Sequence, residues 1–285
     1  MRYFLLLIYM GLVFNTAARI QAQTLDETYA FANSLFESNN YAFALKTYER
    51  VLFFDKSAQY QSDCYYQLGE CNLVLGNYQN AENYYDLAYH NVSDDSLKNE
   101  IIFRKVISLL LLQRYNDGLI ELFQLGNNLN KEQLQRKQFY LGIAYFGKEQ
   151  FDKSFDIFKT LVENDSTALT ELDILQNKSQ KIEKINPKTA RILSMIIPGA
   201  GQMYAGDFKS GLNSMALTGG IAVFMLVVAI NYSFFDAFLS VSPWFTRYYM
   251  GGYEGAEKIA IQKKKEKQTE VYQNVLQVIK RSQAR

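Results

Sequence analysis

A repeat of 36 or 37 residues runs through the first half of the chain and restricts the folds open to it. Four positions, three of them occupied by small residues, recur at intervals of 37, 37 and 36: Ala32, Gly69, Val106 and Gly142. An aromatic residue stands nine positions after each of them: Tyr41, Tyr78, Tyr115 and Phe151. A period of this length indicates a stack of helical hairpins in which every unit packs on the next.

Two further positions complete the register of the repeat. A small residue stands twelve positions after the first one of each unit: Ala44, Ala81, Gly118 and Ser154. A bulky residue follows four positions later: Tyr48, Tyr85, Leu122 and Phe158. Small residues let two helices approach closely, and a bulky residue one turn later packs on the same face. We therefore expect these positions to form the core, whereas Tyr65, Tyr66, Tyr84 and Tyr89 stay candidates for peptide contact.

The repeat units resemble the tetratricopeptide repeat. The residues that carry the resemblance are Leu68-Gly69 with Ala81 and Tyr85, and Leu141-Gly142 with Phe151 and Phe158. We place about four units over residues 23–165, although the units run a few residues long and lack the usual proline at the end of the second helix. The resemblance implies a curved all-α solenoid whose concave face binds a protein or peptide partner.

The N-terminus is typical of an export signal. Arg2 precedes an apolar stretch over residues 4–14 that is too short to span a bilayer, which takes about 20 residues. Ala18 and Ala22 suit a cleavage site, so we expect residues 1–22 to be a signal peptide and the repeats to be periplasmic. The alternative is an uncleaved anchor helix.

The chain shows no pattern that predicts catalysis, a cofactor or a metal site. Lys and Arg number 30 against 29 Asp and Glu, so net charge does not favour nucleic acid, and we expect no small-molecule substrate either. Cys64 and Cys71 are the two cysteines, and His90 is the single histidine. Seven residues of helix would separate the cysteines by roughly 10 Å, which exceeds disulfide reach, so we expect free thiols.

The chain enters a membrane, by our interpretation, after a charged connector. Residues 166–190 predict a capping and juxtamembrane helix, started by Ser166 or Thr167, which closes the last apolar face of the solenoid. Residues 191–253 predict a membrane domain. Its firm span is 208–231, begun by an Asp207 cap, and includes twenty uncharged residues from Gly211 to Ile230.

The second membrane segment, residues 234–253, is weaker because it contains two charges and a proline. Ser242-Pro243 predicts a break followed by a new aromatic helix at the interface. Asp236 and Arg247 are candidate functional groups, since charges at membrane depth often have a function, although both could equally lie near the headgroups. Residues 254–285 predict a basic helical tail, either bound to anionic lipid or solvated.

A short glycine-rich segment before the firm span resembles a second family. Its residues fit a PGxGQxYxG signature: Pro198, Gly199, Gly201, Gln202, Tyr204 and Gly206. This signature is typical of a small membrane domain in envelope proteins of Bacteroidetes-type bacteria, often placed behind tetratricopeptide repeats. No activity comes with the resemblance, and the segment itself predicts a turn into the first membrane helix.

These patterns together predict an all-α protein: a helical-hairpin solenoid followed by a transmembrane helix or helical hairpin. The expected function is a membrane-anchored scaffold that binds a protein or peptide at the bacterial cell envelope. The alternative is an accessory subunit of an insertion or transport assembly in which the membrane domain is the active part. The export signal places the repeats in the periplasm, but lysines and arginines flank both membrane segments and would place them in the cytoplasm.

Overall fold

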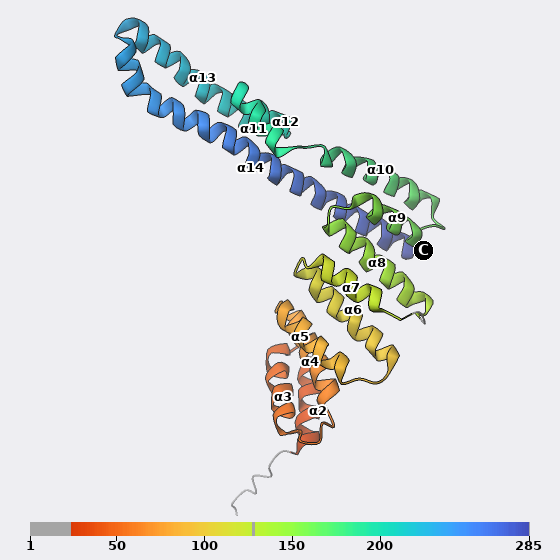
Figure 1. Ribbon diagram of the computed structural model, residues 1–285. Helices are drawn as coiled ribbons and strands as arrows, with labels where there is room; N and C mark the ends of the chain where they lie inside the picture. Colours follow the sequence, from red (N-terminus) through yellow and green to blue (C-terminus); the bar gives the residue numbers. More distant parts are fainter. Residues whose placement is uncertain (1–23, 127–128, 285) are drawn as a thin grey trace, which may run out of the picture. The chain divides into compact units, whose positions relative to one another are not determined.

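The computed structural model describes residues 24–126 and 129–284, and within them every regular element is an α-helix (Figure 1). The predicted signal peptide lies outside the described residues. The chain divides into two compact units, one that ends at Leu129 and one that begins at Asn130. The all-α prediction is confirmed, and the first unit consists of helices packed in consecutive pairs.

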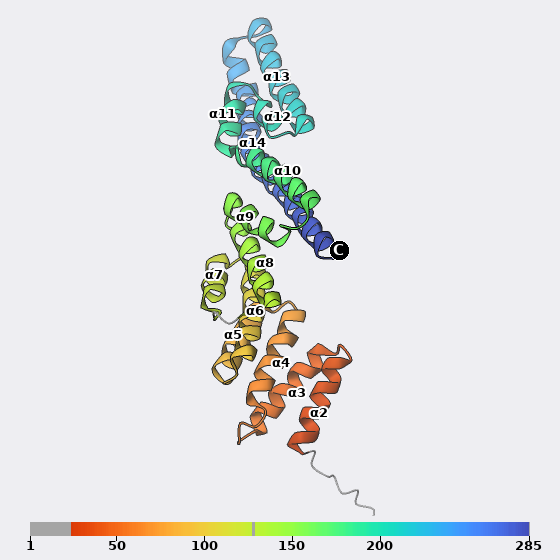
Figure 2. The ribbon, with the colours of Figure 1, turned by 90° about the vertical axis from the view of Figure 1, so that its right-hand side faces the viewer.

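The described part of the first unit is a stack of helical hairpins. Each helix packs against the next one in the chain, as Figure 2 shows for α2 to α5. The hairpins are α2 (Leu25–Glu37) with α3 (Tyr41–Phe54), α4 (Gln61–Val74) with α5 (Tyr78–His90), and α6 (Asp95–Leu111) with α7 (Tyr115–Gln124). This order is that of a helical-repeat solenoid.

The repeat positions form the core of these hairpins. Those with no exposed surface include Ala32, Ala44, Tyr48, Ala81 and Tyr85, whereas Tyr41 and Tyr78 are partly buried. The Tyr48 hydroxyl donates to the Asn33 Oδ1 atom at 2.7 Å, and the Tyr85 hydroxyl donates to the Glu70 Oε1 atom at the same distance. The same buried hydrogen bond therefore recurs one repeat later. It satisfies a phenol that would otherwise lose its partner on burial.

The turn inside each hairpin also repeats in its backbone. One residue per turn has a positive φ angle, and these residues share the spacing of the repeat: Asn39, Gly76, Gln113 and Glu149. In each turn the next amide donates to a carbonyl five residues earlier, as Asn40 N does to Leu35 O at 2.8 Å. This bond pattern ends a helix in a left-handed residue and leads at once into the next helix.

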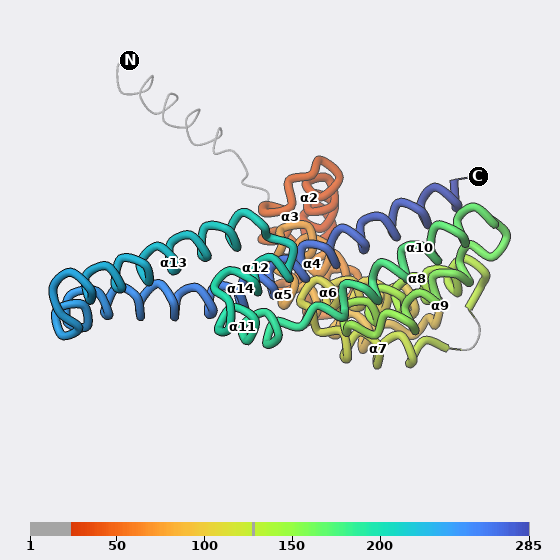
Figure 3. The backbone as a smooth tube through the Cα atoms, turned by 90° about the horizontal axis from the view of Figure 1, so that it is seen from above, coloured from red at the N-terminus to blue at the C-terminus, as the bar shows by residue number. Residues whose placement is uncertain are grey.

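The second unit begins with a fourth hairpin of the repeat and continues into a long helical hairpin. Its helices are α8 (Lys131–Gly147), α9 (Phe151–Leu161), α10 (Ser166–Glu183), α11 (Pro187–Ile196), α12 (Ala200–Tyr204), α13 (Phe208–Asn231) and α14 (Phe234–Gln283). Helix α14 lies beside α13, then beside α11 and α12, and finally beside α10 (Figure 3). It therefore extends from the turn after α13 back to the repeat hairpin.

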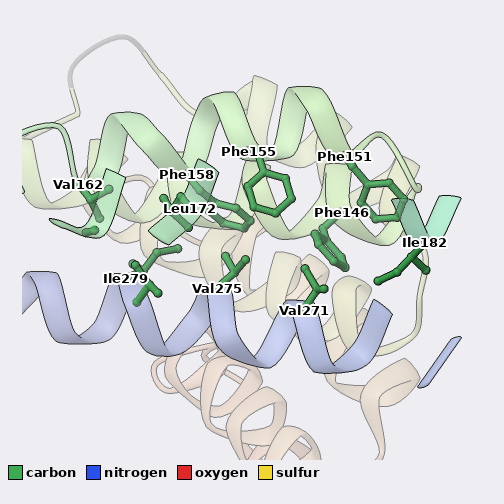
Figure 4. Close-up of a cluster of buried hydrophobic side chains, with 12 residues drawn as sticks. Phe146, Phe151, Phe155, Phe158, Val162, Leu172, Ile182, Val271, Val275 and Ile279 are labelled. Atoms are coloured by element: carbon green, nitrogen blue, oxygen red, sulfur yellow. The ribbon is translucent and has the colours of Figure 1, made fainter. Parts of the chain in front are cut away.

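The C-terminal part of α14 belongs to the core of the second unit. Buried side chains of four helices meet there: Phe146 of α8, Phe151, Phe155 and Phe158 of α9, Leu172 and Ile182 of α10, and Val271, Val275 and Ile279 of α14 (Figure 4). We expected residues 166–190 to close this face, and we expected the tail to be solvated or lipid-bound. That expectation is wrong for the tail, because its valine and isoleucine stripe covers the aromatic face that α10 leaves open.

Two further expectations about local structure need correction. Asp165, not Ser166 or Thr167, is the N-cap of α10, since its side chain accepts a hydrogen bond of 3.0 Å from Ala168 N. Helix α14 also passes through Pro243 without the predicted break. Ala237 and Val241 are buried on the preceding turns. Their packing supports the helix where proline removes one backbone hydrogen bond.

Candidate functional site

The PGxGQxYxG segment, residues 198–206, forms a tight corner in which positions 199 and 201 have no room for a side chain. Gly199 has a φ angle of 93°, and a Cβ atom on it would collide with the Gly211 carbonyl oxygen of α13. A Cβ atom on Gly201 would collide with the Ala190 carbonyl oxygen of α11. Three helices thus approach at backbone distance, and Gly206, with φ of 92°, turns the chain into α13.

A buried chain of hydrogen bonds runs through this corner. Ser194 Oγ accepts from Gly201 N at 2.9 Å and donates to Gln202 Oε1 at 2.8 Å. Gln202 Nε2 then donates to the Gly252 carbonyl of α14 at 2.9 Å. Ser194 and Gln202 are both almost fully buried. The polar groups of the segment therefore satisfy one another and join α11, α12 and α14, which is a structural task rather than a chemical one.

Aromatic hydroxyls and one ion pair extend this network at its edge. Tyr204 donates to the Lys184 carbonyl at 3.2 Å, and Tyr249 donates to the Met195 carbonyl at 2.7 Å. The Arg191 guanidinium lies 3.2 Å from Glu257 and 5.3 Å from the centre of the Tyr253 ring.

The predicted cap of α13 is confirmed, since Asp207 Oδ1 accepts from Ser210 N at 3.0 Å.

The hairpin of α13 and α14 presents large apolar side chains on its outside. Those with more than half of their surface exposed include Phe224, Ile230, Phe234, Phe235 and Trp244. By length and composition, α13 is the one described helix that suits a membrane span, and only 6% of its apolar window is buried. At 1.5 Å per residue, its 24 residues extend roughly 36 Å, enough to cross a bilayer core of about 30 Å.

The structure separates the two charged candidates, Asp236 and Arg247. Asp236 lies in the first turn of α14, where its Oδ2 atom accepts from Ser233 Oγ at 2.7 Å and its amide donates to the same hydroxyl at 3.1 Å. This exchange is a reciprocal N-terminal cap, which accounts for an acidic residue at that position. Arg247 lies three helical turns further on and takes no part in the cap.

Arg247 instead lines a cleft between α13 and α14, called the hairpin cleft below. Its volume is about 320 Å³, and its walls include Ser214, Thr218, Gly251 and Gly255. The Ser214 Oγ and Thr218 Oγ1 atoms are buried and have no hydrogen-bond partner in the described structure. Sequence reasoning missed this cleft, although a signal for it was present. Polar residues recur every four positions along α13, at Ser210, Ser214 and Thr218. Arg247, Gly251 and Gly255 recur at the same interval along α14, so the two stripes can face each other.

The first unit offers a different surface between α3 and α5. A hollow of about 470 Å³ is lined by Glu49, Asn80, Asn83 and Tyr84, together with Asn72 of α4. The Tyr84 ring stacks on Tyr65 with centroids 6.5 Å apart, while Tyr65, Tyr66 and Tyr89 pack partly into the core. Amide side chains both donate and accept, so this hollow suits the backbone of an extended peptide.

The two cysteines are free and buried, as expected. Burial raises the pKa of the Cys64 thiol and of the Cys71 thiol to about 12. Thiols of this kind are protonated at neutral pH and do not act as nucleophiles. No cluster of three or more His, Cys, Asp or Glu side chains in the described residues is arranged to hold a metal ion.

No family model, curated protein or solved structure matches this chain. The description of the chain as a helical-repeat solenoid with an apolar helix therefore rests on its own repeat register, turns and packing.

Proposed function

We propose that this protein is a membrane-anchored scaffold of the bacterial cell envelope, whose tetratricopeptide-like repeats bind a protein or peptide. One observation carries the proposal. In the second unit a single helix, α14, forms one arm of the apolar hairpin and also completes the core of the repeat hairpin α8–α9. A large exposed apolar surface marks a membrane or partner site, so the continuous helix links the repeat hairpin directly to such a surface.

The anchoring part of the proposal follows from the path of the chain. The hairpin enters the bilayer at Phe208, turns at 231–234 and returns along α14, so residues 130–207 and 254–284 end on the same side. Lys188, Arg191, Lys258 and Lys263 lie on these flanks, where anionic lipid headgroups attract basic side chains. The signal peptide predicted for residues 1–22 makes this side the periplasm.

The binding part of the proposal is supported by the hollow between α3 and α5. Its asparagine and tyrosine side chains offer donors, acceptors and flat apolar area in one place. The backbone of an extended peptide placed against Asn80 and Asn83 would replace its hydrogen bonds to water with hydrogen bonds to these side-chain amides. The partner is thus a protein segment rather than a small metabolite or nucleic acid.

A second candidate function is an accessory subunit of a membrane insertion or transport assembly. The observation that favours it is the unpaired polarity of the hairpin cleft, which a passive anchor does not require. The two functions differ in where a partner binds: the repeats for the scaffold, the hairpin for the subunit. Crosslinking from each region and identification of the captured proteins separates them.

Site-specific labelling tests the topology on which both functions depend. In a Cys64→Ala and Cys71→Ala background, single cysteines are introduced by Ser38→Cys, Tyr232→Cys and Gln283→Cys. In spheroplasts, a membrane-impermeant maleimide should label positions 38 and 283, and should label position 232 only after the membrane is opened. Protection of position 38 would place the repeats in the cytoplasm, and equal labelling of 232 and 283 would show that the hairpin does not cross.

A further inference from the structure

Arg247 is an exposed charged residue near the middle of the apolar part of the hairpin. A Cβ atom on Gly252 would lie 2.9 Å from Ser214 Oγ, so these two residues fix the register of α13 against α14. Arg247 is five residues nearer the turn than Gly252, and Thr218 is four residues nearer it than Ser214. Both therefore lie at one level, and ten residues after Phe208 that level is roughly 15 Å into α13.

The hairpin supplies no counter-ion at this level. Asp236 is the one acidic residue between 208 and 253, and it lies eleven residues before Arg247, where it caps α14 with Ser233. Charged groups inside a membrane generally pair with one another or with a polar cavity, because apolar surroundings do not solvate them. The Arg247 side chain is exposed, and the structure shows no ion pair to it within the described residues, so a carboxylate of another molecule can reach it.

The hairpin cleft also contains two hydroxyl groups that have no hydrogen-bond partner in the described structure. Thr218 is 2% exposed, and its Oγ1 atom has no partner in the described structure. The Ser214 Oγ atom, one turn away on the same face, is equally without one. A buried hydroxyl without a partner costs free energy, which an incoming acceptor would recover. Two hydroxyls beside a guanidinium form a donor set for a carboxylate.

The wall of the cleft on α14 leaves room for a helix. Gly251 and Gly255 follow Arg247 at intervals of four residues, so all three share one face of α14. A Cβ atom on either glycine would meet no atom within 4 Å, so both glycines border open space. Two glycines at this spacing are typical of places where a second membrane helix approaches at backbone distance.

We propose that the hairpin cleft binds a transmembrane helix of another protein that carries an Asp or Glu near its middle. The carboxylate pairs with Arg247 and accepts hydrogen bonds from Ser214 and Thr218, while the partner backbone packs on Gly251 and Gly255. A lipid phosphate does not fit, because phosphates lie at the bilayer surface and not some 15 Å below the start of α13. A parallel second copy does not fit either, since its own Asp236 lies at the level of the turn.

The inference rests on the proposed insertion of the hairpin into a bilayer, so insertion is measured first. The full chain, with a Gln283→Cys label in the cysteine-free background, is reconstituted in phosphatidylcholine liposomes and floated on a density gradient. Failure to float would overturn the proposed anchoring itself. Flotation leaves the assignment of the cleft to be tested separately in the same vesicles.

Energy transfer to synthetic helices tests the cleft. The probe is a labelled leucine-alanine helix of transmembrane length with one Glu at its centre. Matched helices have Leu at the centre, or have Glu moved to one end. The central Glu should raise the apparent affinity about fivefold or more over both, as expected for interhelical hydrogen bonding in a membrane. Arg247→Gln should remove this preference, and Thr218→Val should reduce it. Lys209→Gln, which removes a charge outside the cleft, should keep it.

Four results would overturn the assignment. The first is equal affinity for central Glu and central Leu, and the second is a preference that survives Arg247→Gln. The third is enrichment of spin-labelled phosphatidylglycerol around the protein that depends on Arg247, together with no binding of the synthetic helices. This result would make the cleft a lipid site. The fourth is energy transfer between two labelled copies that disappears with Arg247→Gln, which would make a second copy the occupant.

Discussion

The side-chain amide of Gln202 donates a hydrogen bond of 2.9 Å to the backbone carbonyl of Gly252, although 50 positions separate the two residues in sequence. Gln202 is only 3% exposed and also accepts from the Ser194 hydroxyl. This one side chain therefore holds the corner at residues 198–206 against the returning helix α14. This contact joins α12 to α14 at Gly252, the residue whose close approach to Ser214 sets Arg247 opposite Thr218.

Gln202→Ala should destabilise the membrane-proximal part of the second unit. The substitution leaves the buried Ser194 hydroxyl without the acceptor to which it donates, which costs about 1–3 kcal/mol, and it also removes the hydrogen bond to the Gly252 carbonyl. Thermal unfolding of the purified protein in detergent should show a lower midpoint. Gln262→Ala is the matched control, because Gln262 is exposed and bonds only to Glu266. Equal midpoints for the two variants would contradict the structural role given to Gln202.

Gly69→Ala should destabilise the first unit, because the Tyr85 ring leaves no room for a side chain at that position. A Cβ atom on Gly69 would lie 2.5 Å from Tyr85 Cε1, and Tyr85 is fully buried and held by Glu70. Overpacking of this kind typically costs about 1–3 kcal/mol. Urea unfolding followed by circular dichroism measures the change.

Gly118→Ala is the control, at the second small position of the repeat, in α7. The nearest atom to its Cβ would be 3.6 Å away, which is an ordinary contact. Since alanine favours a helix interior over glycine by up to about 1 kcal/mol, this variant should be as stable as the parent protein or more so. A loss of stability as large as that of Gly69→Ala would show that the repeat register is not the cause.

Stability of the first unit should fall as the pH rises from 9 toward 12. Burial raises the pKa of Cys64 and Cys71 from 9.0 to about 12, whereas the unfolded chain ionises both thiols near the ordinary value. In this window the folded state holds more protons than the unfolded state, so increasing pH favours unfolding; below pH 9 the contribution is fully present.

Urea midpoints at pH 8 and pH 10.5 measure this effect. The difference between the two midpoints should be smaller in the Cys64→Ala and Cys71→Ala double variant than in the parent protein. Some alkaline loss should remain, because burial also raises the pKa of Tyr48 and Tyr85. The thiols should also resist a disulfide reagent at pH 8 until urea unfolds the chain. Rapid reaction in the folded protein would contradict their burial.

The repeat could be predicted from sequence because its signals are local. Small and aromatic residues at fixed spacing determine which faces meet, and turn-forming residues lie where left-handed backbone is needed. Two of the four left-handed positions, Asn39 and Gly76, carry residues that favour this conformation. Gln113 and Glu149 do not, and there the packing of the flanking helices imposes the turn. Such positions are recognised only after the register has been found.

The path of α14 and the hairpin cleft were not predictable in the same way, because both depend on contacts between distant segments. A stripe of valine and isoleucine in a lysine-rich tail is compatible with a solvated helix, a lipid-bound helix or a core helix. Only the aromatic face left open by α9 and α10 decides among them. The helix break predicted at Pro243 was wrong for a similar reason. Local propensity favours the end of a helix at proline, whereas tertiary packing continues α14 through it. The cleft requires the register of α13 against α14, which comes from the close approach of Ser214 and Gly252.

Ile279→Ala should show that the C-terminal part of α14 completes the core around α9 and α10. Ile279 is 1% exposed and lies among side chains of α9 and α10 (Figure 4). Removal of a buried isoleucine side chain to alanine costs about 2–5 kcal/mol. Gln273→Ala, an exposed position on the same helix, should leave the midpoint of urea unfolding unchanged. If both variants unfold together with the parent protein, α14 does not contribute to the core. If only Ile279→Ala is destabilised, its loss should be smaller in a Leu172→Ala background, because the two side chains share one cluster and their effects are not additive.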